Sequence, residues 1–524
     1  MNKKSILLSS VAVTGFTLLI KLLGIIKQST IAYVCGATME SDMFFVATGI
    51  ISQLSIALFS AISISLLTTF SKAKQDEGIE KANKIASCAI KVFIPITAAI
   101  VLLINCLAYP IAYLLAPSYS QESLLVLATY IRILSVALIP SCLYLIINVP
   151  LENDKVFLPG KMQGFFLNLF IIIAAVFLYK PLGIISLVIA FLLSMVTQVV
   201  FVATIARKRF KFHFGKTDSF VYVKKILLLS LPLIIGNAAY EINDIVDKKI
   251  ALSLGEGAAS MLNYGASINE IVTGIIVSSV SVVLFANFAS WVAENKIDKL
   301  SEVLKNSLTC LFVLILPLML ICILSGDVII RILYGRGKFS ESDIGDIYYL
   351  TSGVVIGYAA GFIFQAARAI VVKAYYAFNN TLLPTVTGVI SVVLNITLSI
   401  ILSKPLGVMG IALATSIGMA FSSFILLLFI KKVLPSFRFK ALLPETLKSV
   451  AAIFIAGTAF WLLNRFTDYN IYLKFIVNCA ALFVLYTAFL GVFKSETLKG
   501  LLKKLKRGRN GEEDEKGIDN SSGL

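Results

Sequence analysis

Stretches of about 20 apolar residues recur along nearly the whole of this 524-residue chain, and no other feature restricts its fold as strongly. A helix needs about 20 residues to cross the roughly 30 Å hydrocarbon core of a bilayer, whereas membrane barrel strands have about 10 residues of alternating polarity. Only 14% of the residues are charged, against about 25% in soluble globular proteins. The chain is therefore predicted to be an all-α polytopic membrane protein.

Fourteen such stretches are predicted to be transmembrane helices. They cover residues 5–35, 42–70, 84–115, 123–150, 156–179, 183–206, 224–253, 258–290, 303–333, 345–377, 382–402, 406–430, 446–464 and 471–493. The seven cysteines are scattered without a CxxC pair, and His213 is the only histidine. Metal ligation and thiol chemistry thus have few candidate residues, and no metal is expected.

The net charge of +17 is concentrated in alternate connecting segments. The basic segments are 72–84, 207–216, 296–305, 431–440 and 503–509. Lysine and arginine collect on the cytoplasmic side of membrane proteins, so both termini are predicted to be cytoplasmic. This placement favours attraction to anionic membrane lipids and argues against a nucleic-acid partner.

The chain contains an internal repeat. KPLGIISLVIA begins at Lys180 and KPLGVMGIALA at Lys404, 224 positions later. LLSSVAVTG at residue 7 and LPLIIGNAA at residue 231 have the same spacing. A repeat of this length indicates two parallel six-helix lobes, which in transporters commonly enclose a central cavity and alternate its access by rocking.

The predicted organisation follows from this repeat. The parts are an N-terminal six-helix lobe (1–206), a basic cytoplasmic linker (207–223), a C-terminal six-helix lobe (224–434), two further transmembrane helices (445–493) and a charged cytoplasmic tail (494–524).

Two lysines occur inside the first predicted span, in the segment KLLGIIKQST. Lys21 and Lys27 interrupt an otherwise apolar helix. An ion inside a span costs at least about 2.5–3.5 kcal/mol, so such residues usually face a water-filled cavity. The alternative is that their long side chains extend along the helix to the headgroups. Both interpretations stay open at this point.

Other charges lie within the predicted spans: Asp42, Glu241, Asp244, Asp247, Lys248, Lys249, Glu270, Arg368 and Lys373. Most belong to the first two spans of either lobe, which predicts a polar central chamber. Its basic members suit an anionic ligand such as a phosphate. The spacing of Asp244 and Lys248 is also consistent with a simple i,i+4 ion pair.

Four motifs carry a family resemblance. They are KLLGIIKQ (21–28), DMFFVA from Asp42, GRGKFSESD (335–343) and KAYYAFNNTLLP (373–384). With them, residues 1–493 resemble the MurJ/MviN lipid II flippases of the multidrug/oligosaccharidyl-lipid/polysaccharide exporter (MOP) superfamily.

The resemblance implies a flippase, not an enzyme, in the bacterial plasma membrane. Its substrate would be an undecaprenyl-diphosphate-linked saccharide, lipid II, which it would translocate by alternating access for peptidoglycan and cell-wall synthesis. No cofactor is implied beyond a coupling monovalent cation, Na⁺ or H⁺, or the membrane potential. Partners would be this substrate, anionic lipids and the machinery of cell-envelope biosynthesis.

The same resemblance, with the buried charges, nominates site residues. The predicted substrate-binding residues are Lys21, Lys27, Asp42, Ser260, Glu270, Arg368 and Lys373. The predicted monovalent-cation site consists of Asp244, Asp247 and Asn380.

The chain departs from the family pattern at several of these positions. Gln28 and Asn380 stand where the family has aspartate. Ser55, Ile56 and Ser267 stand where it has arginines associated with gripping the diphosphate of lipid II. These changes leave open a flippase for another lipid-linked oligosaccharide, such as an O-antigen, capsule or exopolysaccharide unit.

Three other function classes fit the sequence less well. A cation-coupled drug antiporter would need a chamber that does not repel cationic drugs, and lysines would repel them. An enzyme acting on lipid-linked sugars would need acidic pairs on large aqueous loops, and no such loop is evident. A non-transporting scaffold for envelope assembly is the third.

Overall fold

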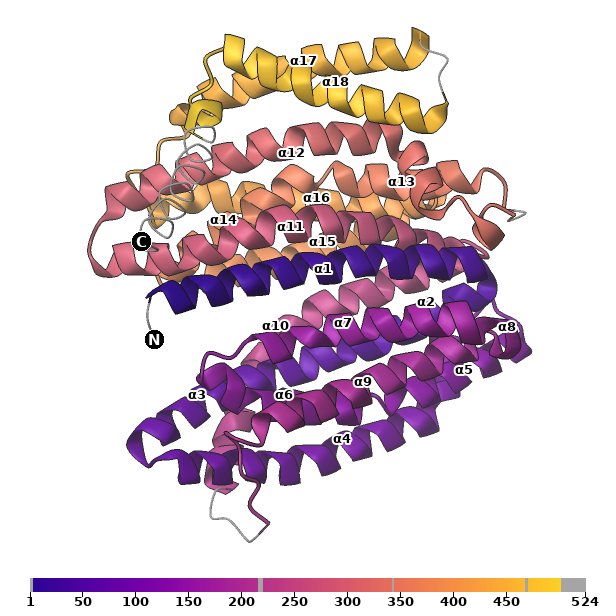
Figure 1. Cartoon of the computed structure of the whole chain (residues 1–524), viewed down its shortest axis with the longest axis vertical. Helices are drawn as coiled ribbons and strands as arrows, with labels where there is room; N and C mark the ends of the chain where they lie inside the picture. The colour runs from indigo at the N-terminus through magenta and orange to yellow at the C-terminus, as the bar shows by residue number, and fades with distance from the viewer. Residues whose placement is uncertain (1–2, 215–219, 342–343, 467–469, 501–524) are drawn as a thin grey trace, which may run out of the picture. The chain divides into compact units, whose positions relative to one another are not determined.

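A computed structural model of the chain describes residues 3–214, 220–341, 344–466 and 470–500. Within these ranges the regular structure is helical and no strand occurs (Figure 1). Each of the fourteen predicted spans coincides with one helix or with two consecutive helices. The predicted all-α polytopic fold is thereby confirmed.

The helices of the first half run in chain order as follows: α1 (Lys3–Cys35), α2 (Met39–Ser55), α3 (Ala61–Asp76), α4 (Ile79–Leu115), α5 (Gln121–Ser135), α6 (Leu138–Asn153), α7 (Leu158–Ile173), α8 (Tyr179–Leu182) and α9 (Ile185–Ala206). A π-helical turn, η1 (Ile56–Ser60), joins α2 to α3, and a second, η2 (Ala174–Leu178), joins α7 to α8.

The second half contains α10 (Phe220–Ser253), α11 (Ala258–Ala293), α12 (Ile297–Tyr334), α13 (Ile347–Ala359), α14 (Phe362–Ala377), α15 (Leu382–Leu406), α16 (Val408–Phe429), α17 (Leu443–Phe466) and α18 (Ile471–Val492). Short 3₁₀ turns are η3 (Gly337–Phe339), η4 (Ile430–Lys432) and η5 (Phe439–Ala441).

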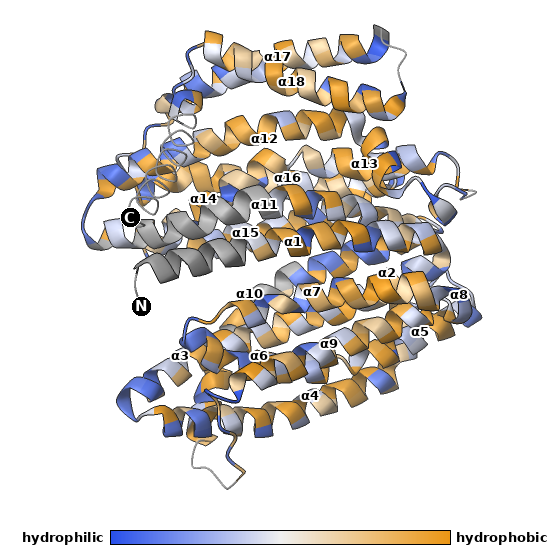
Figure 2. Ribbon diagram, viewed as in Figure 1, coloured by the Kyte–Doolittle hydropathy of each residue, from blue (hydrophilic) through white to orange (hydrophobic). Residues whose placement is uncertain are grey.

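Twelve helical segments are long and apolar enough to cross a bilayer, counting the described residues alone. Figure 2 shows an example of such a segment: α4 is hydrophobic along most of its length and hydrophilic where it joins α3. The predicted spans outside the twelve are α10 and α11. Both helices include residues whose side chains the structure does not describe.

The chain divides into two compact units. Unit 1 comprises Met1–Ile268, Leu333–Val354 and Val392–Ala414, and unit 2 comprises Asn269–Ile332, Val355–Ser391 and Thr415–Leu524. The lobe boundaries expected from the sequence repeat stay a prediction.

Unit 1 is held together by apolar packing and by side chains that satisfy backbone groups of neighbouring helices. One core cluster joins α6 to α9 through Tyr144, Ile147, Leu151, Val202 and Ala206. The Tyr144 hydroxyl donates to the Gly160 carbonyl at 2.7 Å, and the Asn168 amide on α7 donates to the Ile20 carbonyl on α1 at 3.0 Å. Such bonds matter inside a bilayer, since no water there can satisfy buried polar groups.

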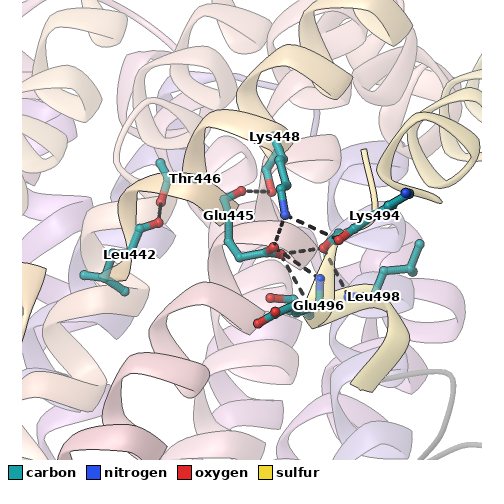
Figure 3. A network of polar contacts seen from close by, with 10 residues as sticks. Leu442, Glu445, Thr446, Lys448, Lys494, Glu496 and Leu498 are labelled. Atoms are coloured by element: carbon teal, nitrogen blue, oxygen red, sulfur yellow. Dashed lines mark hydrogen bonds and ion pairs between the residues drawn. The ribbon is translucent and has the colours of Figure 1, made fainter. Parts of the chain in front are cut away.

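In unit 2, α17 and α18 lie side by side (Figure 1) and share a core with α12. The Tyr486 hydroxyl on α18 donates to the Val313 carbonyl on α12 at 3.0 Å. Figure 3 shows the polar contacts at the start of α17. There Glu445 accepts from the Ser495 hydroxyl at 2.6 Å and from Lys448 at 2.9 Å. These contacts fix the chain that leaves α18 against the start of α17.

Two backbone features recur at the spacing of the sequence repeat. Gly183 and Gly407, 224 positions apart, have φ angles of 61° and 57°. Lys155 and Asn379, also 224 positions apart, have φ angles of 62° and 56°. Residues with side chains rarely adopt this left-handed conformation, so its recurrence at matched positions is what two copies of one lobe would show.

Candidate functional site

The predicted site lysines lie on α1, a helix of 33 residues and about 50 Å. Lys21 and Lys27 are both half-buried. Among the described residues, no carboxylate forms an ion pair with Lys21. Gln28, seven positions from Lys21 and so on its face of the helix, donates to the Asn263 amide oxygen of α11 at 3.0 Å. The other side-chain atom of Gln28, Oε1, is buried and has no hydrogen-bond partner in the described part of the chain.

Asp42 and Ser260, predicted as site residues, are in direct contact. Asp42 is fully buried at the start of α2. Its carboxylate accepts from the Gly257 amide at 2.8 Å, the Ser260 amide at 2.6 Å and the Ser260 hydroxyl at 2.6 Å. Gly257 and Ser260 are the N-cap and third residue of α11, whose amides lack partners within the helix. Asp42 therefore caps α11 from another helix and stabilises the positive end of its dipole.

Three glycines bring the turns around Asp42 into close contact. Gly36, Gly257 and Gly337 have φ angles of 69°, 77° and 59°. A Cβ at Gly257 would lie 2.5 Å from the Ala37 carbonyl oxygen, and one at Gly337 would collide with the Tyr33 carbonyl oxygen. Only glycine allows both the conformation and the approach. The α1–α2, α10–α11 and α12–α13 connections thus form one tight structure, which we call the turn junction.

The motif GRGKF contributes its phenylalanine to the turn junction. Phe339 is fully buried. Its ring centroid lies 5.6 Å from that of Tyr264, 6.0 Å from that of Tyr334 and 5.8 Å from that of Tyr348. Separations of 4.5–7 Å are typical of favourable aromatic pairs. The sequence analysis singled out this motif. It did not predict how Phe339 packs, because the packing involves residues far apart in the chain.

Asp244 and Lys248 form the ion pair that their spacing allowed, with an N–O distance of 2.5 Å. Gln53 on α2 also donates to Asp244, at 2.7 Å. The ammonium of Lys248 passes directly over Gly49 of α2, where any Cβ would clash with it. Gly49 and Gln53 are four positions apart on one face of α2. Gln53 thus makes a polar contact between α2 and α10, and Gly49 leaves room for Lys248 beside it. The sequence analysis did not find this contact.

Asp247 lies in a separate buried cluster and is 6% exposed. It accepts from the Ser399 hydroxyl at 2.9 Å and from the Asn243 amide at 3.2 Å. The Ser399 hydroxyl also lies 3.4 Å from Asn395 Oδ1. Carboxylate, hydroxyl and amide oxygens are the donors that hard cations prefer. Ser399 was not predicted, although its position one turn after Asn395 on α15 was a signal.

The remaining predicted residues belong to unit 2. Glu270 is exposed. The Arg368 guanidinium donates to the Ser422 hydroxyl at 2.9 Å, and the Lys373 ammonium lies 6.0 Å from the centre of the Tyr376 ring. Asn380 accepts from the Leu383 amide at 3.5 Å, at the start of α15.

Unit 2 also contains an apolar cavity of about 190 Å³. Side chains of α12, α14, α16 and α17 line it, among them Phe312, Phe364 and Leu427. Most of its wall is aliphatic or aromatic, so it suits a hydrocarbon chain better than a polar headgroup.

Comparison with known proteins gives consistent results. A family model described as "Lipid II flippase MurJ" matches residues 31–481. A probable lipid II flippase MurJ of Treponema pallidum (strain Nichols) is 26% identical over 486 residues, which are 89% of this chain and 90% of the relative.

Two solved structures are similar. One, described as "Lipid II flippase MurJ, inward closed conformation", has a TM-score of 0.79 at 24% identity and covers 92% of this chain and 98% of that chain. The other, an inward-facing multidrug resistance MATE family transporter of the MOP superfamily, has a TM-score of 0.67 at 14% identity. The match covers 80% of this chain and 98% of that chain. At these identities the likeness concerns the fold.

Proposed function

The chain belongs to the lipid II flippase MurJ family, whose model matches residues 31–481, and from this we propose that it translocates lipid II across the bacterial plasma membrane. The match over most of the chain is the observation that carries the proposal. It agrees with the prediction of a transporter rather than an enzyme. The diphosphate and sugars of a lipid-linked precursor cannot cross hydrocarbon unaided, whereas its polyprenyl tail can remain there.

We propose that Lys21 and Lys27 bind the diphosphate. Both are half-buried inside a predicted membrane span, where a charge is costly. Lys21 has no acidic partner among the described residues, and the buried acceptor of Gln28 lies on the same helix face. An ammonium is a competent point-charge ligand for phosphate. Glu270, Arg368 and Lys373 complete the proposed substrate-binding set.

The turn junction would be the closed outer gate. With both termini in the cytoplasm, as the placement of basic residues predicts, the turn after α1 lies on the outer side. Opening the chamber outward by rocking of the lobes would have to separate α2 from α11. Such separation removes Asp42 from the start of α11 and leaves the Gly257 and Ser260 amides to water.

Coupling to a monovalent cation is proposed at the cluster around Asp247. The carboxylate, the Ser399 hydroxyl and Asn395 Oδ1 supply oxygen donors in a buried place. Asp244 and Asn380 remain the other predicted members of this cation site. Alternatively, the membrane potential alone would supply about 2.3 kcal/mol per charge per 100 mV.

We propose that the polyprenyl tail runs along α17 and α18 and uses the apolar cavity lined by α12, α14, α16 and α17. The proposed setting is the bacterial plasma membrane with both termini inside, in contact with anionic lipids and cell-envelope biosynthesis proteins. A C-terminal fusion to a fluorescent protein that matures only in the cytoplasm tests the orientation. Fluorescence is expected, and its absence in an expressed fusion would contradict the topology.

Complementation tests the function. The wild-type chain and a Lys21→Ala/Lys27→Ala double variant are expressed in a strain depleted of its own lipid II flippase, and protein levels are checked in the membrane fraction. Lys180→Ala/Lys404→Ala, which removes two exposed lysines, is the matched control. Growth is expected for the wild type and the control only.

The outcomes separate the claims. Rescue by both the wild type and the Lys21→Ala/Lys27→Ala variant would preserve lipid II transport and remove the diphosphate role of the lysines. Failure of an expressed wild-type chain would point to a different lipid-linked saccharide, as the departures at Ser55, Ile56 and Ser267 allow.

A further inference from the structure

The segment that follows α9 alternates basic and aromatic residues. Residues 207–214 read RKRFKFHF, with phenylalanine at positions 210, 212 and 214. We call this segment the strap. It belongs wholly to unit 1 and takes no part in the proposed substrate or cation sites.

The strap is fixed against the helices of unit 1 at three points. The Arg209 guanidinium lies 3.2 Å from a carboxylate oxygen of Asp154, in the turn after α6. The His213 amide donates to the Ser87 hydroxyl of α4 at 3.1 Å. The Lys91 ammonium of α4 donates to the Phe214 carbonyl at 3.1 Å. The strap thus follows the surface of α4 instead of extending away from it.

The charge pattern of the two adjoining helices gives the depth of the strap in the membrane. Lys91 is the last charged residue of α4 before an uncharged run from 92 to 121. The helical part of this run, residues 92–115, is about 36 Å long at 1.5 Å per residue, enough to cross the hydrocarbon core. The uncharged run of α9 likewise ends at Arg207. Lys91 and Arg207 therefore mark the headgroup boundary, and the strap lies beside it.

The three aromatic rings are exposed progressively along the strap. Phe210 packs against the core cluster between α6 and α9. The ring centre of Phe212 lies 5.6 Å from the Lys91 ammonium. The Phe214 ring packs edge-on against the Phe212 ring, with ring centres 4.8 Å apart. Phe214 is 88% exposed. Such a side chain is unfavourable in water and favourable at the membrane interface, where aromatic residues collect.

Three basic residues of the strap have no ion-pair partner among the described residues. Arg207, Lys208 and Lys211 are exposed, and none of them forms an ion pair within the described ranges. The nearby carboxylate of Asp154 is already bound by Lys74 at 2.6 Å and by Arg209. Basic residues next to an interfacial aromatic side chain are complementary to anionic phospholipids.

We propose that the strap is a binding site for anionic glycerophospholipid headgroups, in which Phe214 inserts between the lipids and Arg207, Lys208 and Lys211 contact their phosphates. The site anchors the start of the inter-lobe linker to the bilayer surface. It rests on the proposed membrane placement of the chain and does not depend on which substrate the chain translocates.

Tryptophan fluorescence tests the site in the full-length protein. The Phe214→Trp variant is reconstituted in liposomes of phosphatidylcholine and phosphatidylglycerol at fixed composition, with brominated acyl chains on one lipid or the other. The signal of the native Trp291 and Trp461 is measured in the wild type and subtracted. Quenching by brominated phosphatidylglycerol is expected to exceed quenching by brominated phosphatidylcholine, a ratio well above one.

Two further variants make the result specific. Adding Lys208→Gln and Lys211→Gln to Phe214→Trp removes two of the three proposed phosphate contacts and is expected to lower the ratio towards one while quenching persists. Tyr113→Trp, at the other end of α4, is 56% exposed in an uncharged stretch and is expected to give a ratio of one.

Equal quenching by both lipids at Phe214→Trp, or a preference that loss of the two lysines leaves undiminished, would overturn the assignment to anionic lipid. Absence of quenching by either lipid would place the strap in water and overturn the proposal altogether. Because no substrate is present, failure here leaves the flippase proposal untouched, and failure of complementation leaves this measurement valid.

Discussion

Asp42 and Asp247 are both buried carboxylates of unit 1, yet their surroundings differ. Asp42 receives three hydrogen bonds, from two backbone amides and a hydroxyl at the start of α11. Asp247 receives bonds from the Ser399 hydroxyl and a side-chain amide, and Asn395 Oδ1 lies 3.4 Å from that hydroxyl. Fixed backbone donors stabilise an anion permanently, whereas side-chain oxygens can turn towards a cation. Burial of an acid therefore does not by itself identify a ligand site.

Replacing Asp42 is the strongest test of this comparison. Asp42→Ala removes a charged acceptor and leaves buried amides unpaired, so we expect a loss of about 3 kcal/mol in stability. Denaturant unfolding of the purified protein in detergent measures it. Glu122→Ala, an exposed acid in the first turn of α5, is the control and should cost less than ~1 kcal/mol. Equal effects of the two substitutions would mean that Asp42 is no more than an ordinary helix-terminal acid.

Two glycine substitutions sharpen the description of the turn junction around Asp42. Gly337 and Gly183 have nearly equal φ angles, 59° and 61°, but only a Cβ at Gly337 would meet another backbone. Gly183→Ala is expected to cost about 1 kcal/mol for its conformation alone, and Gly337→Ala at least about 2 kcal/mol. The difference between their unfolding free energies measures the close approach to Tyr33. Equal losses of unfolding free energy in the two variants would show that the turn junction accommodates a Cβ at Gly337 and is not tightly packed there.

Asp247→Asn is expected to have the opposite pattern to Asp42→Ala: a small effect on stability and a large effect on the response to Na⁺. Among the described residues no backbone amide donates to Asp247, so removing its charge should change stability in the absence of Na⁺ by less than ~1 kcal/mol. The increase in melting temperature produced by Na⁺ in the wild type should disappear, while in Asp244→Asn it should persist in part. Potassium or choline chloride at equal ionic strength is the control. An undiminished response to Na⁺ in Asp247→Asn would exclude this cluster as the cation site.

Asp154, outside the spans, gives the smallest expected effect. Its burial would raise the pKa, but the hydrogen bond and charge of Lys74 and the charge of Arg209 outweigh this and lower the pKa of the carboxyl. A carboxyl whose pKa is lowered by folding stabilises the folded protein at pH values above its ordinary pKa, near 4. This stabilisation is lost as the pH falls through the lowered pKa of the folded protein. Since the pair is partly exposed, the contribution should be below ~1 kcal/mol. Asp154→Asn should lose this part of the acid dependence, measured as melting temperature from about pH 7 to about pH 3; an unchanged profile would contradict it.

The sequence allowed prediction of all fourteen helical spans and of the Asp244–Lys248 ion pair. These features depend on local properties, namely the length of an apolar run and the 3.6-residue period of the helix. The π-helical segment between α2 and α3 and the turn between α5 and α6 were not anticipated, because both lie inside continuous apolar runs. Asp42 and Ser260 were both nominated as site residues, and their role in the site stays a prediction; the cap that joins them could not be read from residues 218 positions apart.

What the sequence determined by itself is the class of protein, because hydrocarbon admits only segments that satisfy their own backbone, and a run of about 20 apolar residues can do so only as a helix. It also predicted that charges lie inside the spans, at Lys21, Lys27 and Asp42 and along α10. Only the tertiary structure showed which distant segments contact several of these charges. Their partners come from distant segments: α11 for Asp42, α15 for Asp247 and Gly49 of α2 for the approach of Lys248. Because these contacting residues are far apart in the sequence, only the fold determines which of them lies beside a given charge.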